Sequence, residues 1–209
     1  IIIAGGVGSF EPRKLTLKDA EQYEGKSLFY AVKNIHEFKD KNISIFGGGD
    51  SALDWALELS KFSNITLIHR RDEFRGAPHT LSEIKKLSKA GKLSIKTPCQ
   101  LEVIEGSKDI QSITIKFEDG KREKIKTNII LSFFGLIMKL GPIAEWGLNM
   151  DKKTITVNPH NFETNKKGIF AAGDICNYPG KLKLILSGFH EVALASVECF
   201  KRARPNEKY

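Results

Sequence analysis

Residues 47–52 have the composition and spacing of a loop that binds the phosphates of a dinucleotide. They read Gly-Gly-Gly-Asp-Ser-Ala and fit the pattern GxGxxA. In such a loop Gly47 allows a tight turn, Gly49 lets the backbone approach a pyrophosphate, and the small Ala52 lets helix and strand pack closely. The following helix offers free N–H groups to the phosphates. We take Gly47, Gly49, Asp50, Ser51 and Ala52 as candidate nucleotide-binding residues; the alternative is a glycine-rich turn without a ligand.

The residues that end the next expected strand indicate which nucleotide would bind. They are His69, Arg70 and Arg71, with Arg75 close behind. An NAD site places a carboxylate here to accept from the ribose 2′-hydroxyl, whereas guanidinium groups bind a 2′-phosphate. The sequence therefore favours NADP(H) over NAD(H). Asp72 and Glu73 lie beyond the strand end, and we expect them to pair with their basic neighbours; the alternative for the arginines is a solvated basic turn.

A second motif covers residues 164–174. It consists of Thr164, four variable residues and an apolar strand that ends in Gly173 and Asp174. This motif resembles the second FAD fingerprint of flavoproteins that bind two dinucleotides, in which the aspartate accepts a hydrogen bond from a ribitol hydroxyl of FAD. The alternative is a strand-to-helix turn in which Asp174 caps the following helix.

Another pair of glycines, Gly6 and Gly8, begins like a phosphate loop after a short apolar run. Glu11 stands at its third glycine position, and Pro12 and Arg13 follow where a helix would have to begin. We reject this segment as a phosphate loop, so the first FAD fingerprint is absent from the sequence. Because the chain also starts inside an apolar run and not with methionine, we expect it to be a fragment of a longer protein.

The nucleophilic and metal-binding residue types form no recognisable constellation. The three cysteines are Cys99, Cys176 and Cys199. They are far apart, and they form neither a CxxC pair nor a spacing typical of metal ligands. Such a pattern favours a reduced, cytoplasmic protein without a dithiol centre of its own. The histidines are scattered, and we find no triad and no paired carboxylates. We therefore name no catalytic residue and no metal site.

Composition and charge narrow the class of protein further. The 209 residues are 41% hydrophobic and 28% charged, which is typical of a globular protein of one or two domains. No apolar run approaches the roughly 18 residues that a membrane span requires. The net charge of +8 favours an acidic partner or a polyanionic ligand, and does not by itself indicate nucleic acid. The alternative is a solvated, lysine-rich surface.

Hydrophobic periodicity predicts an α/β fold around the glycine motif. Strands over 42–46 and 64–68 flank a helix over 50–62, which makes one βαβ unit of a parallel sheet. Further along we expect a helix over 78–90, strands over 93–96, 110–117, 121–126 and 128–134, and a final helix over 188–201. Residues 10–42 look irregular.

Taken together, these residues resemble the ferredoxin–NADP reductases of the thioredoxin-reductase-like type, over essentially the whole chain. The segments that carry the resemblance are 3–6 with 10–13, 47–55, 69–75, 146–148, 173–176 and 181–189. The thioredoxin reductases themselves are similar over the same motifs. Their CxxC would fall between about residues 25 and 41, and that stretch has no cysteine.

The resemblance implies a Rossmann-like NADP-binding domain inserted in a split FAD-binding domain. Residues 1–25 would end the first FAD segment, 26–134 would form the NADP domain, and 135–209 would form the second FAD segment. Phe10 would stack at the flavin side of the site and Asp174 would contact FAD. The glycine loop would line the NADP pyrophosphate, and the arginines its 2′-phosphate.

The implied activity is electron transfer from NADPH through FAD to ferredoxin, an acidic iron–sulfur protein. The resemblance also implies a homodimer for the full-length protein. Without the first FAD fingerprint, we expect the 209-residue chain by itself to be inactive. The alternatives are a thioredoxin reductase-like flavoprotein, which the missing CxxC disfavours, and a nucleotide-binding redox module without turnover.

Overall fold

The computed structural model describes residues 1–6 and 8–208, and for Phe10 only the backbone. The chain divides into two compact units. One is continuous, Pro12–Gly135, and the other combines Ile1–Glu11 with Leu136–Tyr209. Residues 12–25, which the family resemblance assigns to the first FAD segment, lie in the continuous unit. Ala20 and Tyr23 are buried there, and the Tyr23 hydroxyl donates to the Gly106 carbonyl at 2.8 Å.

A five-stranded parallel sheet forms the centre of the continuous unit. Its order is β3-β10-β4-β5-β6. The strands are β3 (Leu28–Phe29), β4 (Asn42–Phe46), β5 (Asn64–Ile68), β6 (Leu93–Lys96) and β10 (Ile129–Ser132). The bounds of β4, β5 and β6 match the expectation. β3 lies in the stretch that looks irregular in sequence, because two residues are too few to show a period.

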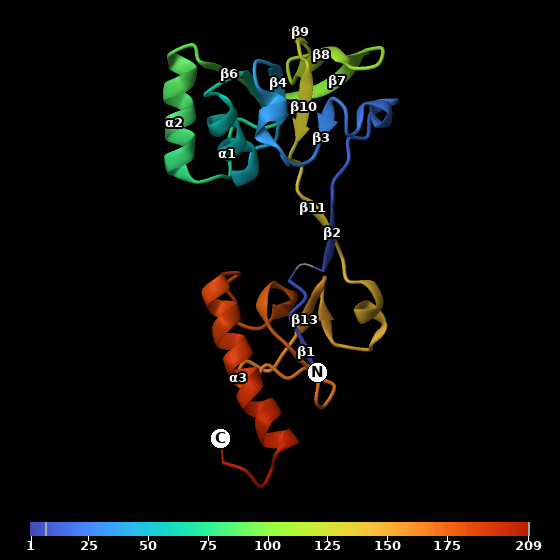
Figure 1. The fold of residues 1–209 in the computed structure, drawn as a ribbon, viewed down its shortest axis with the longest axis vertical. Helices are drawn as coiled ribbons and strands as arrows, with labels where there is room; N and C mark the ends of the chain where they lie inside the picture. The colour runs from blue at the N-terminus through green and yellow to red at the C-terminus, as the bar shows by residue number, and fades with distance from the viewer. Residues whose placement is uncertain (7, 209) are drawn as a thin grey trace. The chain divides into compact units, whose positions relative to one another are not determined.

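Helices α1 (Asp50–Leu59) and α2 (Pro78–Lys89) cover one face of this sheet (Figure 1). Their core side chains include Ala52, Leu53, Ala56 and Ile84, all fully buried against residues of β4, β5 and β10. α1 ends three residues before its expected end, because residues 60–63 turn into β5. Two 3₁₀ helices, Ala20–Tyr23 and Ile35–Phe38, precede β4.

A three-stranded antiparallel sheet covers the opposite face and takes the place of a crossover helix before β10. It consists of β7 (Cys99–Gly106), β8 (Ile110–Phe117) and β9 (Arg122–Lys126). Ile113 and Ile115 of β8 pack with Leu28, Phe46 and Ile130 of the parallel sheet. The parallel sheet is thus covered on both faces. Its strand β10 is a nearly continuous apolar run, as a strand buried on both faces requires, whereas Ser44 and Thr66 interrupt the apolar residues of β4 and β5.

The second unit contains short strands and one long helix, α3 (Ile185–Ala203), which runs alongside them (Figure 1). The strands are β1 (Ile2–Ile3), β2 (Ser9–Pro12), β11 (Leu136–Lys139), β12 (Met150–Asp151), β13 (Thr154–Thr156), β14 (Phe170–Ala171) and β15 (Cys176–Asn177). The last residue of β2, Pro12, already belongs to the continuous unit. β1 pairs with β14 in parallel, β2 pairs with β11, and β13 lies between β12 and β15. The 3₁₀ helices Gly141–Glu145 and Gly173–Ile175 complete the unit.

No helix among residues 1–6 and 8–208 is long and apolar enough to cross a bilayer.

The final helix is longer than expected, beginning at Ile185 and ending at Ala203. Its first turn contains Gly188, where an added Cβ would lie only 3.5 Å from the Gly173 Cα. This is an ordinary contact distance, and it places the first turn of α3 beside the Gly173–Ile175 turn.

Candidate functional site

The glycine loop follows β4 at the point where the order of the parallel strands reverses. β5 lies on one side of β4 and β10 on the other, and both neighbouring strands run parallel to β4. The chain reaches β5 directly after β4, but returns to β10 only after β9. Ligands of open α/β sheets bind outside the carboxyl ends of the strands at such a reversal. The fold therefore places residues 47–49 where a nucleotide would be held.

Gly47 and Ala52 make the tight contact that the motif requires. A Cβ on Gly47 would lie 2.8 Å from the Phe133 carbonyl oxygen and 2.9 Å from the Ala52 Cβ, and the φ of Gly47 is +152°. The Gly47 N–H donates to the Ile68 carbonyl at 3.1 Å, which ties the loop to the end of β5. Because no side chain fits here, the loop can lie directly on the sheet.

Gly49 and the first turn of α1 form the open side of the same loop. Gly49 is exposed, and an added Cβ would meet no atom within 4 Å. Gly49 is also the N-cap of α1, and no side chain caps this helix. Asp50 and Ser51 are exposed in the first turn. Backbone N–H groups at this helix start are thus open to an anion.

The carboxylate of Asp50 has a second role that the motif does not reveal. Its Oδ1 accepts a hydrogen bond from the Ala77 N–H at 2.8 Å. Gly76 lies against Leu53 of α1, where an added Cβ would come within 2.4 Å of the Leu53 Cδ1. These contacts attach the loop between β5 and α2 to the start of α1.

His69 lies between the glycine loop and the arginine loop. Its imidazole is so close to Gly48 that an added Cβ would be 2.4 Å from the Nε2, and its ring packs on Phe74 with 5.3 Å between centroids. The Arg75 N–H donates to the Gly48 carbonyl at 2.6 Å. Burial lowers the pKa of His69, and the positive charges of the nearby arginines lower it further. A neutral imidazole therefore fits between the two loops.

Arg70, Arg71 and Arg75 are exposed, and all three act electrostatically on His69. Within the described part of the chain, their guanidinium groups have no hydrogen-bond or ion-pair partner. The expectation that Asp72 and Glu73 would pair with them was wrong, since neither carboxylate forms an ion pair among the described residues. Both acidic residues are themselves exposed, and water solvates them at less cost than ordering long side chains into a pair. The three cations remain available to a ligand.

The second motif forms a comparable strand end in the other unit. β1 and β14 run parallel, with Ile3 opposite Ala171, so the glycines after β1 and Gly173 after β14 emerge at the same edge. Gly173 has a φ of +80°, and Asp174 in the next position is half-buried. The Asp174 carboxylate has no partner among the described residues.

Asp174 does not cap the following helix. The N-cap of α3 is Leu184, and Asp174 lies within the Gly173–Ile175 turn. The capping alternative is therefore wrong, because residues 176–184 separate the turn from the helix. A half-buried carboxylate without a protein partner at a strand end suits a ligand with hydroxyl groups.

Two expectations fall on atoms that the structure does not describe. The side chain of Phe10, expected at the flavin side, lies outside the described atoms, as does Val7 within the rejected glycine segment. The backbone of Phe10 belongs to β2.

One buried cluster beside the second motif has no counterpart in the sequence expectations. Glu191 of α3 is fully buried and contacts Lys181, Tyr178, Cys176 and the Gly173 N–H. A charged residue in an otherwise apolar helix face was the available signal. Its partners could not be inferred, because they lie on a loop without periodicity.

Comparison with known proteins gives consistent results. The sequence model of the pyridine nucleotide-disulphide oxidoreductases matches residues 1–195. The chain is 65% identical to the ferredoxin–NADP reductase of Pelagibacter ubique and 47% identical to that of Flavobacterium johnsoniae. The alignments cover the whole chain but 62% and 60% of those proteins. The chain thus spans about three fifths of the length of these curated relatives.

Among solved structures, thioredoxin reductase from Lactococcus lactis superimposes with a TM-score of 0.77 at 28% identity, covering 96% of this chain and 64% of that one. Thioredoxin reductase from T. acidophilum gives 0.79 at 24% identity, covering 97% and 65%, and shows the fold alone.

These matches confirm the resemblance inferred from the motifs. They also confirm the fold class, a two-dinucleotide-binding flavoprotein of the thioredoxin-reductase-like type, and FAD and NADP(H) as the cofactors expected of it. The chain belongs to the pyridine nucleotide-disulphide oxidoreductase family.

Proposed function

We propose that the continuous unit binds NADP(H) and that the whole protein passes electrons from NADPH through FAD to ferredoxin. The observation that carries the proposal is the set of exposed guanidinium groups of Arg70, Arg71 and Arg75, which have no partner among the described residues. They follow β5 beside the glycine loop. Guanidinium groups bind phosphate with two parallel hydrogen bonds, so this set fits a 2′-phosphate.

Each residue of the proposed NADP(H) site has a separate task. Gly49 and the uncapped start of α1 hold the pyrophosphate, with Ser51 in the first turn. Gly47 and Ala52 keep the loop close to the sheet. His69 spaces the two loops, and its low pKa keeps it from adding a cation between them at neutral pH. Asp50 attaches the loop that carries the arginines.

The other unit contributes part of an FAD site in the proposal. Asp174 would accept a hydrogen bond from a ribitol hydroxyl, as the resemblance implies, and Phe10 would lie at the flavin side. When bound, FAD would supply the chemistry that accepts a hydride and releases single electrons. The protein groups place and orient the cofactors, and none of them needs to act as an acid, base or nucleophile. We expect the 209-residue chain by itself to be inactive, because the first FAD fingerprint is not among its residues.

Ferredoxin is the proposed electron acceptor for two reasons. The curated relatives are named ferredoxin–NADP reductases, and the chain carries a net charge of +8, which suits an acidic partner. The cysteines disfavour a thioredoxin reductase. Cys99 and Cys176 are buried, and burial raises their pKa to about 11 and about 12, so neither is a ready nucleophile. No disulfide joins the three thiols, which supports a reducing, cytoplasmic setting. We also propose a homodimer for the full-length protein, on the family resemblance.

Calorimetric titration of the 209-residue chain with NADPH and NADH tests the proposed nucleotide. Each charge-assisted contact to phosphate contributes about 1.5–3 kcal/mol. Two such contacts together contribute at least about 3 kcal/mol. We therefore expect Arg70→Ala/Arg75→Ala to weaken NADPH binding at least about a hundredfold and to leave NADH binding nearly unchanged.

The matched control is Lys85→Ala/Lys89→Ala, which removes two exposed positive charges from α2 of the same unit. It should leave NADPH binding within about twofold of the wild type, because screened charges without contact contribute little. Equal losses for NADPH and NADH in the arginine variant, or equal losses in both variants, would contradict the assignment.

A further inference from the structure

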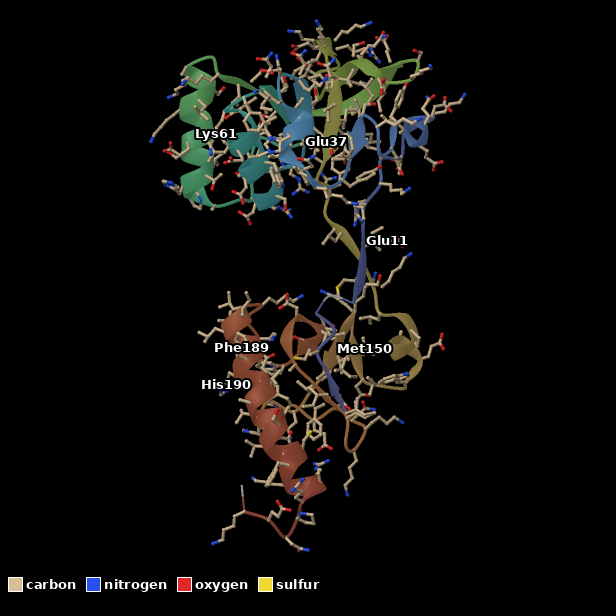
Figure 2. The ribbon with its side chains drawn as sticks, in the orientation of Figure 1. Glu11, Glu37, Lys61, Met150, Phe189 and His190 are labelled. Carbon is tan, nitrogen blue, oxygen red and sulfur yellow. The ribbon has the colours of Figure 1, made fainter. Side chains whose placement is uncertain are left out.

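Glu191 is a charged residue at a position that otherwise belongs to the core. It lies on α3 immediately after Phe189 and His190, which Figure 2 labels, and its exposed fraction is 0%. Phe189 is 72% exposed, so the same turn of the helix carries an apolar side chain outside and a carboxylate inside. Ala195, one turn further along, packs in the hydrophobic core of this unit.

All described partners of the Glu191 carboxylate come from residues 173–181. Its Oε2 accepts from the Gly173 N–H at 2.6 Å and contacts the Cys176 thiol at 3.4 Å. Its Oε1 accepts from the Tyr178 hydroxyl at 2.7 Å and pairs with the Lys181 ammonium group. A single side chain therefore holds the beginning, middle and end of the segment that connects the second FAD motif to α3.

The surroundings of the Glu191 carboxylate favour its charged form. Burial favours the neutral form of Glu191, but hydrogen bonds from Lys181, Tyr178 and Gly173 outweigh it and lower the pKa. The side chain of Lys181 is only 5% exposed. Desolvation of two ions costs about as much as their attraction returns, and replacing a buried ion pair by well-packed apolar residues is often neutral or stabilising. The ion pair therefore needs a reason other than stability.

The position of the Gly173–Ile175 turn provides that reason. The residue after Gly173 is Asp174, a half-buried carboxylate without a partner among the described residues. Nothing in its own side-chain contacts orients Asp174, whereas the neighbouring Gly173 N–H is fixed by Glu191. The first turn of α3 lies beside the same turn, since an added Cβ on Gly188 would be in ordinary contact with the Gly173 Cα at 3.5 Å.

We propose that Glu191 is a positioning residue of the FAD site, which acts through Gly173 to hold Asp174 in the orientation that binds the cofactor, with Lys181 and Tyr178 as its buried partners. This inference rests on the proposed FAD site. It assigns the Glu191–Lys181 ion pair to the placement of the cofactor and not to the stability of the fold. These two roles predict different effects on FAD binding, which can be measured.

The test is an FAD titration of the apoprotein at the full length of its curated relatives, with flavin fluorescence quenching as the readout. Glu191→Gln keeps the shape but leaves Lys181 without its counter-charge. Asp174→Ala removes the proposed ligand. The double variant Asp174→Ala/Glu191→Gln asks whether the two act on the same step. Glu198→Gln is the matched control, since Glu198 lies on the same helix and pairs with Arg202 instead.

We expect Glu191→Gln to weaken FAD binding at least tenfold on the native background and less than twofold on the Asp174→Ala background. Glu198→Gln should stay within twofold of the wild type. Where Glu191→Gln fails to fold, Tyr178→Phe removes one hydrogen bond and no charge, and should weaken FAD binding about threefold on the native background only.

Two results would overturn the inference: FAD affinity within twofold of the wild type in Glu191→Gln, or losses that multiply in the double variant. Unchanged FAD affinity in Asp174→Ala would instead contradict the proposed FAD site, and the inference with it.

Discussion

Gly47 and Gly49 lie in the same loop, but a side chain at each would meet different surroundings. At Gly47 an added Cβ would press on the Phe133 carbonyl and Ala52, whereas at Gly49 it would point into open space. We expect Gly47→Ala to cost about 1–3 kcal/mol of unfolding free energy through overpacking. Gly49→Ala should leave stability nearly unchanged and weaken NADPH binding, because its methyl group would stand where the pyrophosphate approaches.

Denaturant unfolding and NADPH titration of the two variants check this prediction. A Gly49→Ala variant that binds NADPH like the wild type would show that the phosphates do not approach this backbone.

The thiols give a second prediction at the residue scale. At pH 8 a thiol with a pKa of about 11 is only about 0.1% thiolate, and one with a pKa of about 12 still less. We expect a colorimetric disulfide reagent to label at most Cys199 in the native chain and all three cysteines after denaturation. Rapid labelling of two or more thiols in the native chain would contradict the expected burial of Cys99 and Cys176. It would also make a dithiol function possible again.

Contacts between residues that lie close together in the sequence could be predicted from the sequence alone. The close contact of Gly47 with Ala52 follows from the spacing of the motif alone, and so does the placement of the arginines after β5. Glu191 could not be assigned, since its partners are separated from it along the chain and meet it only after α3 has packed. The link from Asp50 to Ala77 was missed for the same reason.

At the scale of elements, the periodic strands and helices were predictable and the irregular ones were not. β8 alternates regularly and has its expected bounds, Ile110–Phe117. β7 was missed because its register shifts between Leu101 and Val103 and again between Glu105 and Gly106, and bulges break the period of two. The sequence predicts the start of α3 at residue 188, three residues too late, because glycine is unusual in a helix interior.

The attachment of the arginine loop to α1 yields a prediction at this scale. Asp50→Ala removes the acceptor for the Ala77 N–H, while Asp50→Asn keeps an acceptor oxygen and removes the charge. We expect the alanine variant to bind NADPH about two- to tenfold more weakly, which corresponds to one lost hydrogen bond. The asparagine variant should bind NADPH as well as the wild type or better, because a negative charge near the phosphates is gone.

Titration of both variants with NADPH distinguishes tethering from charge. Weaker binding in both variants to the same degree would mean that the carboxylate matters as an anion and not as a tether.

At the scale of the whole chain, the net charge of +8 favours a salt-dependent encounter with the proposed acidic partner. Complementary charge raises association rates, and dissolved ions screen it. In the protein at the full length of its relatives, we expect ferredoxin reduction to slow as ionic strength rises, while reduction of the flavin by NADPH slows less. Stopped-flow rates from low to high salt measure both steps, and a salt-independent ferredoxin rate would mean that the lysines serve only solubility.

Identifying the electron acceptor tests the proposed function, electron transfer from NADPH to ferredoxin, most directly. The full-length protein, loaded with FAD, is mixed with NADPH and either an acidic ferredoxin or an oxidised thioredoxin, and reduction of each is followed spectroscopically. We predict rapid ferredoxin reduction with NADPH, much slower reduction with NADH, and none of thioredoxin. Reduction of thioredoxin in place of ferredoxin, or equal rates with NADH and NADPH, would contradict the proposed function.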